Sequence, residues 1–378
     1  MSAHRRDFIR LVGGGAVFAA LPGLTACEAG PDPRAAWTNP GAGEHDPRRI
    51  ALAYGLLAPN PHNMQPWMAD LREAGAITLY IDPSHTLPVT DASGRQILIG
   101  SGGFLELLRM SAAEQGLEAK IIPFPEGDPE PRLDGRPFAR VTFAPGGTRD
   151  PLFAHALARR TSRIPFETRP VPSDAAARIA AAALPGVRAG FALDPARIAV
   201  LKEIAYAGAN IEAHTPTAQH ESCRLTFIGA HDVAAHRYGV SIEGPAIEAA
   251  HALGLLTQAK MEQPGTWAFN QSLDLMKHLA DTAQGFVWLT TPGNSRAEQL
   301  LAGRSYLRIN TQAAAEGLAM HPWSQPLQEY PTMAGLLRRT HQVLAPQGGR
   351  VQMFVRIGYA KPVPPAPRRG LAAQIRNA

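Results

Sequence analysis

The chain has 378 residues, of which 45% are apolar and 18% are charged. That apolar share can form a large core, so the chain is not expected to be disordered as a whole. No apolar run reaches the ~18 residues of a membrane-spanning helix, which excludes a multi-span membrane protein. The net charge of +5 is concentrated at the two ends, whereas a nucleic-acid binder would show broad basic clusters with interleaved aromatics, so no nucleic-acid partner is expected. The two cysteines, Cys27 and Cys223, exclude a disulfide scaffold and a four-cysteine zinc site.

The first 26 residues have the pattern of an export signal. Arg5 and Arg6 are followed by an uncharged stretch from Leu11 to Ala26. A basic start, a short apolar stretch and a small-residue end are typical of a signal peptide. The paired arginines resemble a twin-arginine signal, with an ordinary secretory signal as the alternative. We therefore expect export through the twin-arginine machinery to the periplasm.

Residues 24–27, Leu-Thr-Ala-Cys, also resemble a lipobox. Cys27 is therefore a candidate lipid anchor, and simple cleavage nearby is the alternative. Residues 27–46 are rich in proline, glycine and alanine and are expected to be a linker.

Hydrophobic periodicity then predicts a mixture of helices and strands in two halves, residues 47–150 and 151–378. In the first half we expect a helix from residue 48 to 59, a strand over 77–81, a helix over 104–115 and a short strand over 141–143. In the second half we expect helices over about 151–160, 174–184, 197–213, 245–261, 270–282 and 296–316, and strands over 286–290 and 351–357.

A faint internal repeat connects the two halves. Residues 105–117 end in Ala-Glu-Gln-Gly-Leu and residues 306–318 end in Ala-Ala-Glu-Gly-Leu, at an offset of 201 residues. Both segments are predicted helices closed by a glycine. Helices that end in glycine and leucine are common, so this repeat alone leaves chance open as its explanation.

Three segments carry residues suited to chemistry. Residues 58–67 (APNPHNMQPW) form a rigid, amide-rich turn after a helix, and such amides suit the edge of a heterocycle. Residues 159–166 (RRTSRIPF) offer three arginines and two hydroxyl groups to an anion. Residues 364–369 (PPAPRR) hold two arginines on a stiff proline run. The alternative for each segment is solvated surface. No metal-binding or nucleophile motif is present, so the catalytic residue stays unknown and no metal is expected.

These segments resemble motifs of the nitroreductase family of FMN enzymes. Residues 58–67 resemble its APSxxNxQPW motif, although Asn60 stands where the family usually has serine, and residues 159–166 resemble its RRSxRxF opening. Residues 317–325 (GLAMHPWSQ) resemble the turn behind the flavin ring, and Arg356-Ile-Gly-Tyr followed by Arg368-Arg369 resembles the closing strand and phosphate-binding tail. The resemblance spans about residues 47–370 and implies an α+β, nitroreductase-like fold.

The order of the motifs resembles the Acg-type branch, whose chains are two fused, partly decayed halves. The APSxxNxQPW-like segment comes about a hundred residues before the RRSxRxF-like one, and each half has kept what the other lacks. The resemblance therefore implies a pseudo-dimer within one chain. The insertion at about 185–300 has no counterpart in ordinary members and is expected to cover the open face of the flavin.

The resemblance also implies one FMN, bound mainly by the second half. Its phosphate would contact Arg159, Thr161, and Arg368 or Arg369, and Arg163 would lie near flavin N1 and the C2 carbonyl. Asn60, Asn63 and Gln65 would arrive from the first half. Trp323, Ser324 and Gln325 would line the N5 side, Ser324 through its backbone N–H. Pro59 and Arg160 complete the expected cofactor-binding set.

Three functions remain open at this point. The first is an exported FMN-dependent oxidoreductase that reduces a small electrophile, such as a nitro compound or a quinone. The second is a protein that binds or sequesters FMN without turnover, and the third is a lipoprotein without a cofactor. No segment indicates a nicotinamide dinucleotide site, so the electron donor stays open, as do the substrate and the oligomeric state.

Overall fold

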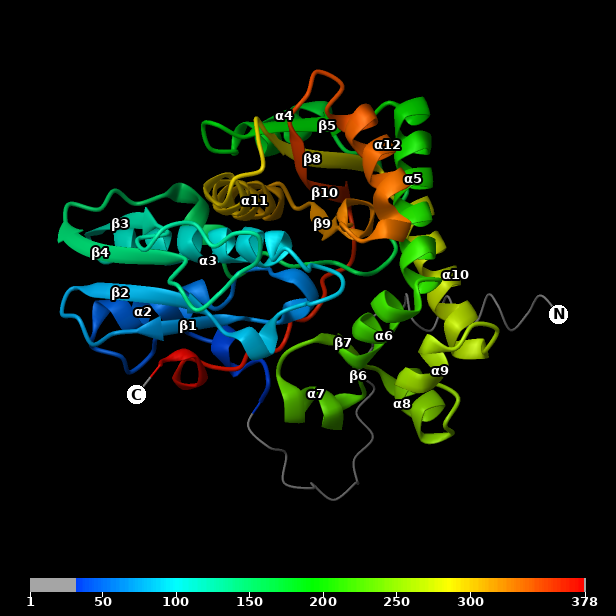
Figure 1. The fold of residues 1–378 in the computed structure, drawn as a ribbon, viewed down its shortest axis with the longest axis horizontal. Helices are drawn as coiled ribbons and strands as arrows, with labels where there is room; N and C mark the ends of the chain where they lie inside the picture. Colours follow the sequence, from blue (N-terminus) through cyan, green and yellow to red (C-terminus); the bar gives the residue numbers. More distant parts are fainter. Residues whose placement is uncertain (1–31, 377–378) are drawn as a thin grey trace.

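The computed structural model describes residues 32–376, so the predicted export signal and Cys27 lie outside the described residues. Two four-stranded antiparallel sheets carry the main body of this part of the chain (Figure 1). The first sheet consists of β1 (Trp67–Asp70), β2 (Ala76–Ile81), β4 (Ala139–Pro145) and β3 (Leu117–Pro123), in that order. The second consists of β5 (Arg188–Ala192), β8 (Gly285–Thr291), β10 (Arg350–Gly358) and β9 (Ala319–Pro322).

The two sheets have the same topology. In each, the first, second, fourth and third strands are neighbours, and every neighbouring pair is antiparallel. The helices α2 (Pro47–Gly55) and α4 (Ser173–Ala181) precede the first strand of their sheets. The long helices α3 (Arg95–Glu114) and α11 (Arg296–Ala315) connect the second strand to the third. This correspondence confirms the predicted α+β architecture of two fused halves.

The helix predicted over 104–115 is wrong at its start, because α3 begins at Arg95. The glycines at 100, 102 and 103 lie inside the helix. At least one of them is needed there for packing. A Cβ atom on Gly102 would lie 2.0 Å from the carbonyl oxygen of Leu300 on α11. Only glycine allows backbones to approach so closely.

The contact between α3 and α11 is reciprocal. A Cβ atom on Gly303 would lie 1.8 Å from the carbonyl oxygen of Ile99. Gly303 is 201 residues after Gly102, and Leu300 is 201 residues after Ile99. The same patch of each helix therefore meets its counterpart, as in an isologous twofold interface. The two halves form a pseudo-dimer around this crossing.

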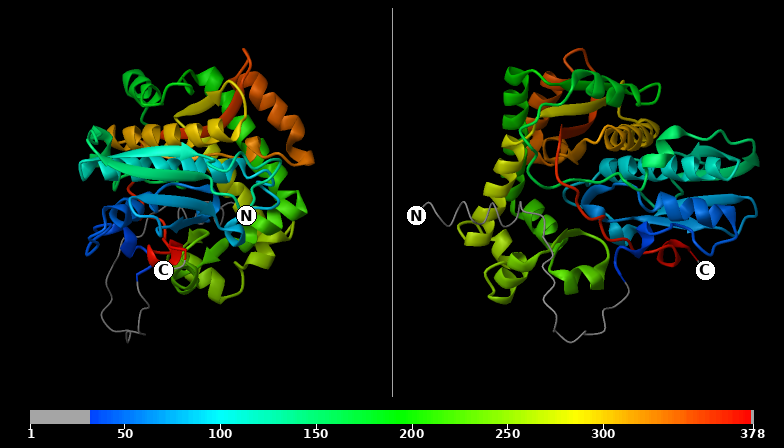
Figure 2. Two further views of the ribbon diagram at one scale, coloured as in Figure 1. Left: turned by 60° about the vertical axis from the view of Figure 1, so that its left-hand side comes forward. Right: turned by 180° about the vertical axis from the view of Figure 1, so that it is seen from behind.

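The insertion of the second half lies in the connection from β5 to β8, residues 193–284. In the first half, the short turn over residues 71–75 takes that place. The insertion contains α5 (Pro195–Ala213), α6 (Pro216–Arg224), β6 (Thr226–Ile228), α7 (Ala230–His236), β7 (Val240–Ile242), α8 (Pro245–Ala252), α9 (Gln258–Glu262) and α10 (Trp267–Asp281). The predicted range of 185–300 was too wide, because β5 and β8 belong to the sheet. Its part from α6 to α9 lies below the second-half sheet and beside the first half (Figure 2).

The remaining elements are short. They are α12 (Ala334–Leu344) and the 3₁₀ turns η1 (Ala35–Trp37), η2 (Pro61–Asn63), η3 (Pro83–His85), η4 (Pro151–His155), η5 (Gln325–Leu327), η6 (Pro331–Met333) and η7 (Ala372–Gln374). The helix predicted over 151–160 is therefore only the turn η4. The predicted linker is also packed in its described part, because η1 buries Trp37 to 8% exposure. Within residues 32–376, no helix is long and apolar enough to cross a membrane.

The C-terminal tail leaves the second-half sheet and crosses to the first half. Ile375 pairs with Ala69 of β1, and the Arg376 N–H donates to the Ala69 carbonyl over 2.8 Å. The tail thus brings residues 364–369 to the first half, beside the loop between α2 and β1. Because the tail, residues 359–376, crosses over in this way, its arginines contact the first half and not the second-half sheet that precedes them in sequence.

Candidate functional site

The segment over residues 159–166 is fixed along the second-half sheet. The Ser162 N–H donates to the Met320 carbonyl of β9 over 2.9 Å. Arg356 of β10 donates to the Ile164 carbonyl over 2.8 Å, and its guanidinium lies 3.9 Å from the centre of the Phe166 ring. Burial lowers the pKa of Arg356 to about 9. Arg356 was expected only as part of the closing strand, and the structure shows that it positions the arginine segment.

Four arginines form an arginine cluster where this segment meets the first half: Arg159, Arg160, Arg163 and Arg368. None of them forms an ion pair with a carboxylate of residues 32–376. Arg159 is 2% exposed and Arg368 is 4% exposed. Burial lowers the pKa of Arg159 to about 10 and that of Arg368 well below its ordinary value, and the charge of Arg160 acts in the same direction on both. Buried charges without a counterion are costly, so the cluster is suited to an anion.

Arg159 joins the two halves directly. Its Nη2 donates to the Leu57 carbonyl of the first half over 2.7 Å, and its Nη1 donates to Asn310 Oδ1 on α11 over 3.0 Å. Its Nε has no partner. Arg160 and Thr161 are half-buried beside it, and Arg160 uses only Nη1, on carbonyls of its own segment. The predicted meeting of the two motif segments is therefore present.

The tail arginines differ from the expectation. The Nε and both Nη groups of Arg368 donate to protein oxygens, chiefly the carbonyls of Leu56, Leu57 and Ala58 directly after α2. These bonds hold the turn that follows the helix, and they leave no donor of Arg368 for a phosphate. The Arg369 backbone N–H donates to Gln65 Oε1 over 2.9 Å, and its Nη1 lies 3.5 Å from Asp82 Oδ2. The direct phosphate contact expected of Arg368 is therefore not available, although its charge remains in the cluster, and the contact expected of Arg369 stays a prediction.

The loop after α2 uses its amides to hold itself in place. The Asn60 side chain accepts from the Gln65 N–H over 2.8 Å, and its Nδ2 donates to the Ala58 carbonyl. Asn63 exchanges hydrogen bonds with Arg368 and the Pro367 carbonyl. Gln65 donates to the Arg237 carbonyl of the insertion over 2.9 Å and accepts from the Arg369 N–H. These amides therefore tie the loop to the tail and to the insertion, and their contact with a flavin stays a prediction. Pro59 is half-buried at the start of the loop.

His62 is the residue of this loop that sequence reasoning missed. Its Nδ1 is buried without a hydrogen-bond partner. Its backbone has φ +45°, and Asn63 and Gln65 are also left-handed. Such strain in residues other than glycine is typical of functional sites. Burial, with a smaller contribution from the positive charge of Arg163, lowers the pKa of His62 to about 4, while the charge of Glu221 opposes this. The signal in the sequence was a histidine and two amides between two prolines.

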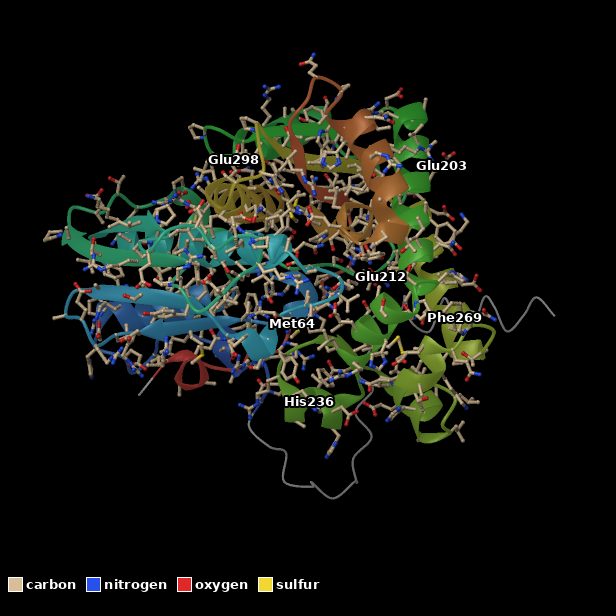
Figure 3. The ribbon with its side chains drawn as sticks, viewed as in Figure 1. Met64, Glu203, Glu212, His236, Phe269 and Glu298 are labelled. Atoms are coloured by element: carbon tan, nitrogen blue, oxygen red, sulfur yellow. The ribbon has the colours of Figure 1, made fainter. Side chains whose placement is uncertain are left out.

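Four buried polar atoms of the two motif segments and of α11 have no hydrogen-bond partner in residues 32–376: His62 Nδ1, Arg159 Nε, Ser162 Oγ and the Tyr306 hydroxyl. Arg163 is exposed, and its charge acts on His62 of the first half and on Tyr306 of the second. Burial raises the pKa of Tyr306, and the charges of Arg159 and Arg163 oppose this rise. Burial and the charges of Arg356 and Arg163 lower the pKa of His321. Arg163 therefore lies near polar groups of both halves that have no partner in the described part of the chain. Figure 3 shows Met64 of the same loop between the first half and the insertion.

The residues expected on the N5 side fall into two groups. Trp323 is fully buried in the second-half core, and its Nε1 donates to the Ala205 carbonyl of α5 over 2.8 Å. It is a core residue, which corrects the expectation that it lines the flavin. Ser324 and Gln325 are half-buried at the start of η5.

A second charged site lies on the paired helices α3 and α11. Glu106 of α3 is fully buried and accepts from Arg109, Arg304 and Arg308 at 2.7–3.0 Å. Asp150 accepts from two of the same arginines. An adjacent hollow of about 590 Å³ is lined by Arg109, Asp150, Arg308 and neighbouring residues. Here every arginine has a carboxylate partner, in contrast to the arginine cluster.

Comparisons with known proteins give sequence relatives along most of the chain. No family model matches it. Over 341 residues, the chain is 28% identical to a Mycobacterium tuberculosis H37Rv protein provisionally named NAD(P)H nitroreductase Rv3131, covering 86% of this chain and 90% of the relative. Over 123 residues it is 35% identical to the provisionally named NAD(P)H nitroreductase acg of the same organism, covering 32% of this chain and 36% of the relative.

Among solved structures, the FMN-dependent nitroreductase NfnB from Mycobacterium smegmatis, in complex with NADPH, is 17% identical to the chain. The match covers 58% of this chain and 95% of that one, with a TM-score of 0.36. A TM-score this low carries no argument about fold or function, so the case for a function depends on the site.

Proposed function

We propose that the chain is a flavoprotein of the nitroreductase family that binds one FMN and reduces a small electrophile, such as a nitro compound or a quinone. The observation that carries this proposal is the arginine cluster, which has four positive charges and no carboxylate partner among residues 32–376. A phosphate group with close to two negative charges is a suitable counterion. The names of the sequence relatives support the same family.

The unpaired polar atoms of the site indicate that its residues can hold FMN. The unpaired Arg159 Nε and Ser162 Oγ lie on the arginine segment, while the unpaired Tyr306 hydroxyl and His62 Nδ1 come from α11 and the first-half loop. A ligand with an anionic end and a polar body would satisfy all four. We propose that Arg159 and Arg160 hold the phosphate, with Thr161 and Ser162 beside it.

FMN, when bound, supplies hydride transfer to the electrophile. The protein supplies orientation and charge. Arg163 is exposed and its positive charge acts on both His62 and Tyr306, and we assign it to the anionic side of the flavin ring. His62 is neutral at pH 7 because burial lowers its pKa to about 4, so it can donate one hydrogen bond to a bound electrophile without adding charge.

The insertion supports the second candidate, a protein that sequesters FMN. Glu221 of α6 accepts from the backbone N–H groups of Val89 and Thr90 over 2.9 and 2.8 Å, and the Gly239 N–H donates to the Asn63 carbonyl. These bonds fix the insertion against the first half beside His62. A fixed cover would slow the entry of an electrophile. Export to the periplasm remains part of the proposal and would require the flavin to be loaded before translocation.

One experiment separates the three candidates. Purified protein is mixed with FMN, freed of excess ligand and examined for the absorption band of bound flavin. The bound flavin is then reduced with dithionite without oxygen and mixed with a nitroaromatic compound or a quinone. Rapid reoxidation supports the oxidoreductase, retained reduced flavin supports sequestration, and absence of bound flavin contradicts both.

A further inference from the structure

The N-terminal strap, residues 32–37, contacts the C-terminal tail at the arginine cluster. The Arg368 N–H donates to the Pro33 carbonyl over 2.9 Å, and Arg34 Nε donates to the Pro365 carbonyl over 2.9 Å. Arg34 also pairs with Glu243 of the insertion. The two ends of the described chain are therefore joined at this point, together with the insertion.

Trp37 at the end of the strap contacts three of the four arginines in the cluster. Its ring centre lies 5.7 Å from the guanidinium carbon of Arg159, 4.9 Å from that of Arg160 and 5.0 Å from that of Arg368. Its Nε1 donates to the Ala366 carbonyl over 2.8 Å. The side chain also packs against the apolar cluster that contains Leu57, Leu152 and Leu307. The ring therefore has one fixed orientation.

The chemistry of this contact explains how three like charges remain together. The face of an indole ring is negative and attracts cations within about 6 Å of its centre. A guanidinium that contacts the face of an aromatic ring does not donate its N–H groups to the ring, so these groups can still form hydrogen bonds. Arg160 Nε and Nη2 have no acceptor in residues 32–376, and Arg159 Nε has none either. The ring thus gathers the arginines and leaves these donors for an anion.

We propose that Trp37 is a positioning residue for the phosphate of the cofactor: it holds Arg159, Arg160 and Arg368 together so that the free N–H groups of Arg159 and Arg160 meet one phosphate. This inference rests on the proposed function and extends it to a segment outside the motifs that suggested it. The strap is therefore part of the cofactor site. Loss of the ring weakens phosphate binding while the ribityl chain and the ring system of the flavin keep their contacts.

The test compares FMN with riboflavin, which lacks the phosphate. Apo protein is titrated with each flavin and followed by flavin fluorescence, for the native chain and for Trp37→Leu and Trp37→Phe. Trp37→Leu keeps apolar bulk but removes the aromatic face, and Trp37→Phe keeps an aromatic face. Trp267→Leu, on α10 of the insertion, is the matched control for loss of a tryptophan. We expect Trp37→Leu to weaken FMN binding roughly tenfold and riboflavin binding less than twofold, with Trp37→Phe close to the native chain.

Equal losses for both flavins would overturn the inference, because Trp37 would then only support the fold. Unchanged FMN binding in Trp37→Leu would also overturn it. A third arm measures inorganic phosphate by calorimetry. If the native chain binds phosphate but neither flavin, the proposed function is wrong, and a weaker phosphate affinity of Trp37→Leu still supports the role of Trp37. If it binds none of the three, both proposals are wrong.

Discussion

Gly303→Ala tests whether the two halves are held by the crossing of α3 and α11. The new Cβ atom would lie 1.8 Å from the carbonyl oxygen of Ile99 and 2.6 Å from its carbonyl carbon. Both obstacles are backbone atoms of α3, so no side-chain rotation relieves the clash and the helices must move apart. Overpacking of this kind costs about 1–3 kcal/mol or more. Alanine recovers about 1 kcal/mol of helix propensity relative to glycine. We therefore expect the free energy of unfolding to fall by about 2 kcal/mol.

The matched control is Gly335→Ala in α12, where an added Cβ atom meets nothing within 4 Å. There the propensity term acts alone and stability should rise by about 0.5–1 kcal/mol. Both variants are compared with the native chain by urea unfolding, followed by circular dichroism. A Gly303→Ala chain as stable as the native one would refute the close reciprocal crossing. A loss of stability in both variants would instead point to a general effect of alanine.

Three further outcomes follow from the structure. Glu106→Ala leaves Arg109, Arg304 and Arg308 without their shared carboxylate. Because the side chain of each arginine is about one-fifth to one-quarter exposed, water offsets part of the cost of a buried charge. We expect the free energy of unfolding, measured with urea, to fall by about 2–3 kcal/mol. Released flavin, measured against protein concentration, should give one FMN per chain, because the second group of arginines, Arg109, Arg304 and Arg308, is neutralised by Glu106 and Asp150. Two FMN per chain would contradict this. In the apo protein, folded His62 stays neutral down to about pH 4, whereas His62 of the unfolded chain takes up a proton below its ordinary pKa of about 6.5, so the free energy of unfolding falls as the pH drops from 6.5 to 4. His62→Asn should reduce this loss by up to about 1.4 kcal/mol per pH unit, measured by urea unfolding at pH 5 and pH 7. The same pH dependence in the variant and the native chain would contradict this.

Much of the fold was predictable from local signals in the sequence. The similar sequences at the ends of the two long helices predicted the offset of 201 residues between the halves. The hydrophobic periodicity predicted α5, α10 and α11 close to their observed bounds. The strands β1, β5 and β9 were not predicted, because each has only four or five residues, and β5 and β9 also take their register from strands distant in sequence. The strand β3 was not predicted either. The start of α3 was missed because its glycines serve a contact with α11 that local patterns do not contain.

The sequence predicted which segments meet at the site, but not the hydrogen-bond partners of their side chains. The sequence placed Arg159 near the first-half loop, and the structure joins them through the Leu57 carbonyl. It could not assign the partners of Asn63 and Gln65, because the tail and the insertion that supply them are about 170–300 residues away. Trp37 was missed for the same reason. Its role depends on Arg159, Arg160 and Arg368, and only the crossed tail brings Arg368 to the other two.

The central claim, that the arginine cluster holds the phosphate of FMN, is tested most directly by Arg159→Ala. A charge-assisted hydrogen bond is worth roughly 1.5–3 kcal/mol, which corresponds to roughly a ten- to hundredfold change in affinity. FMN and riboflavin are titrated into apo protein of the native chain, of Arg159→Ala and of Arg72→Ala, a control in which the arginine pairs with Asp70 at the surface. We expect Arg159→Ala to lose FMN affinity by that factor while its riboflavin affinity hardly changes, and Arg72→Ala to bind both as the native chain does. Equal losses of FMN and riboflavin affinity in Arg159→Ala would contradict the claim.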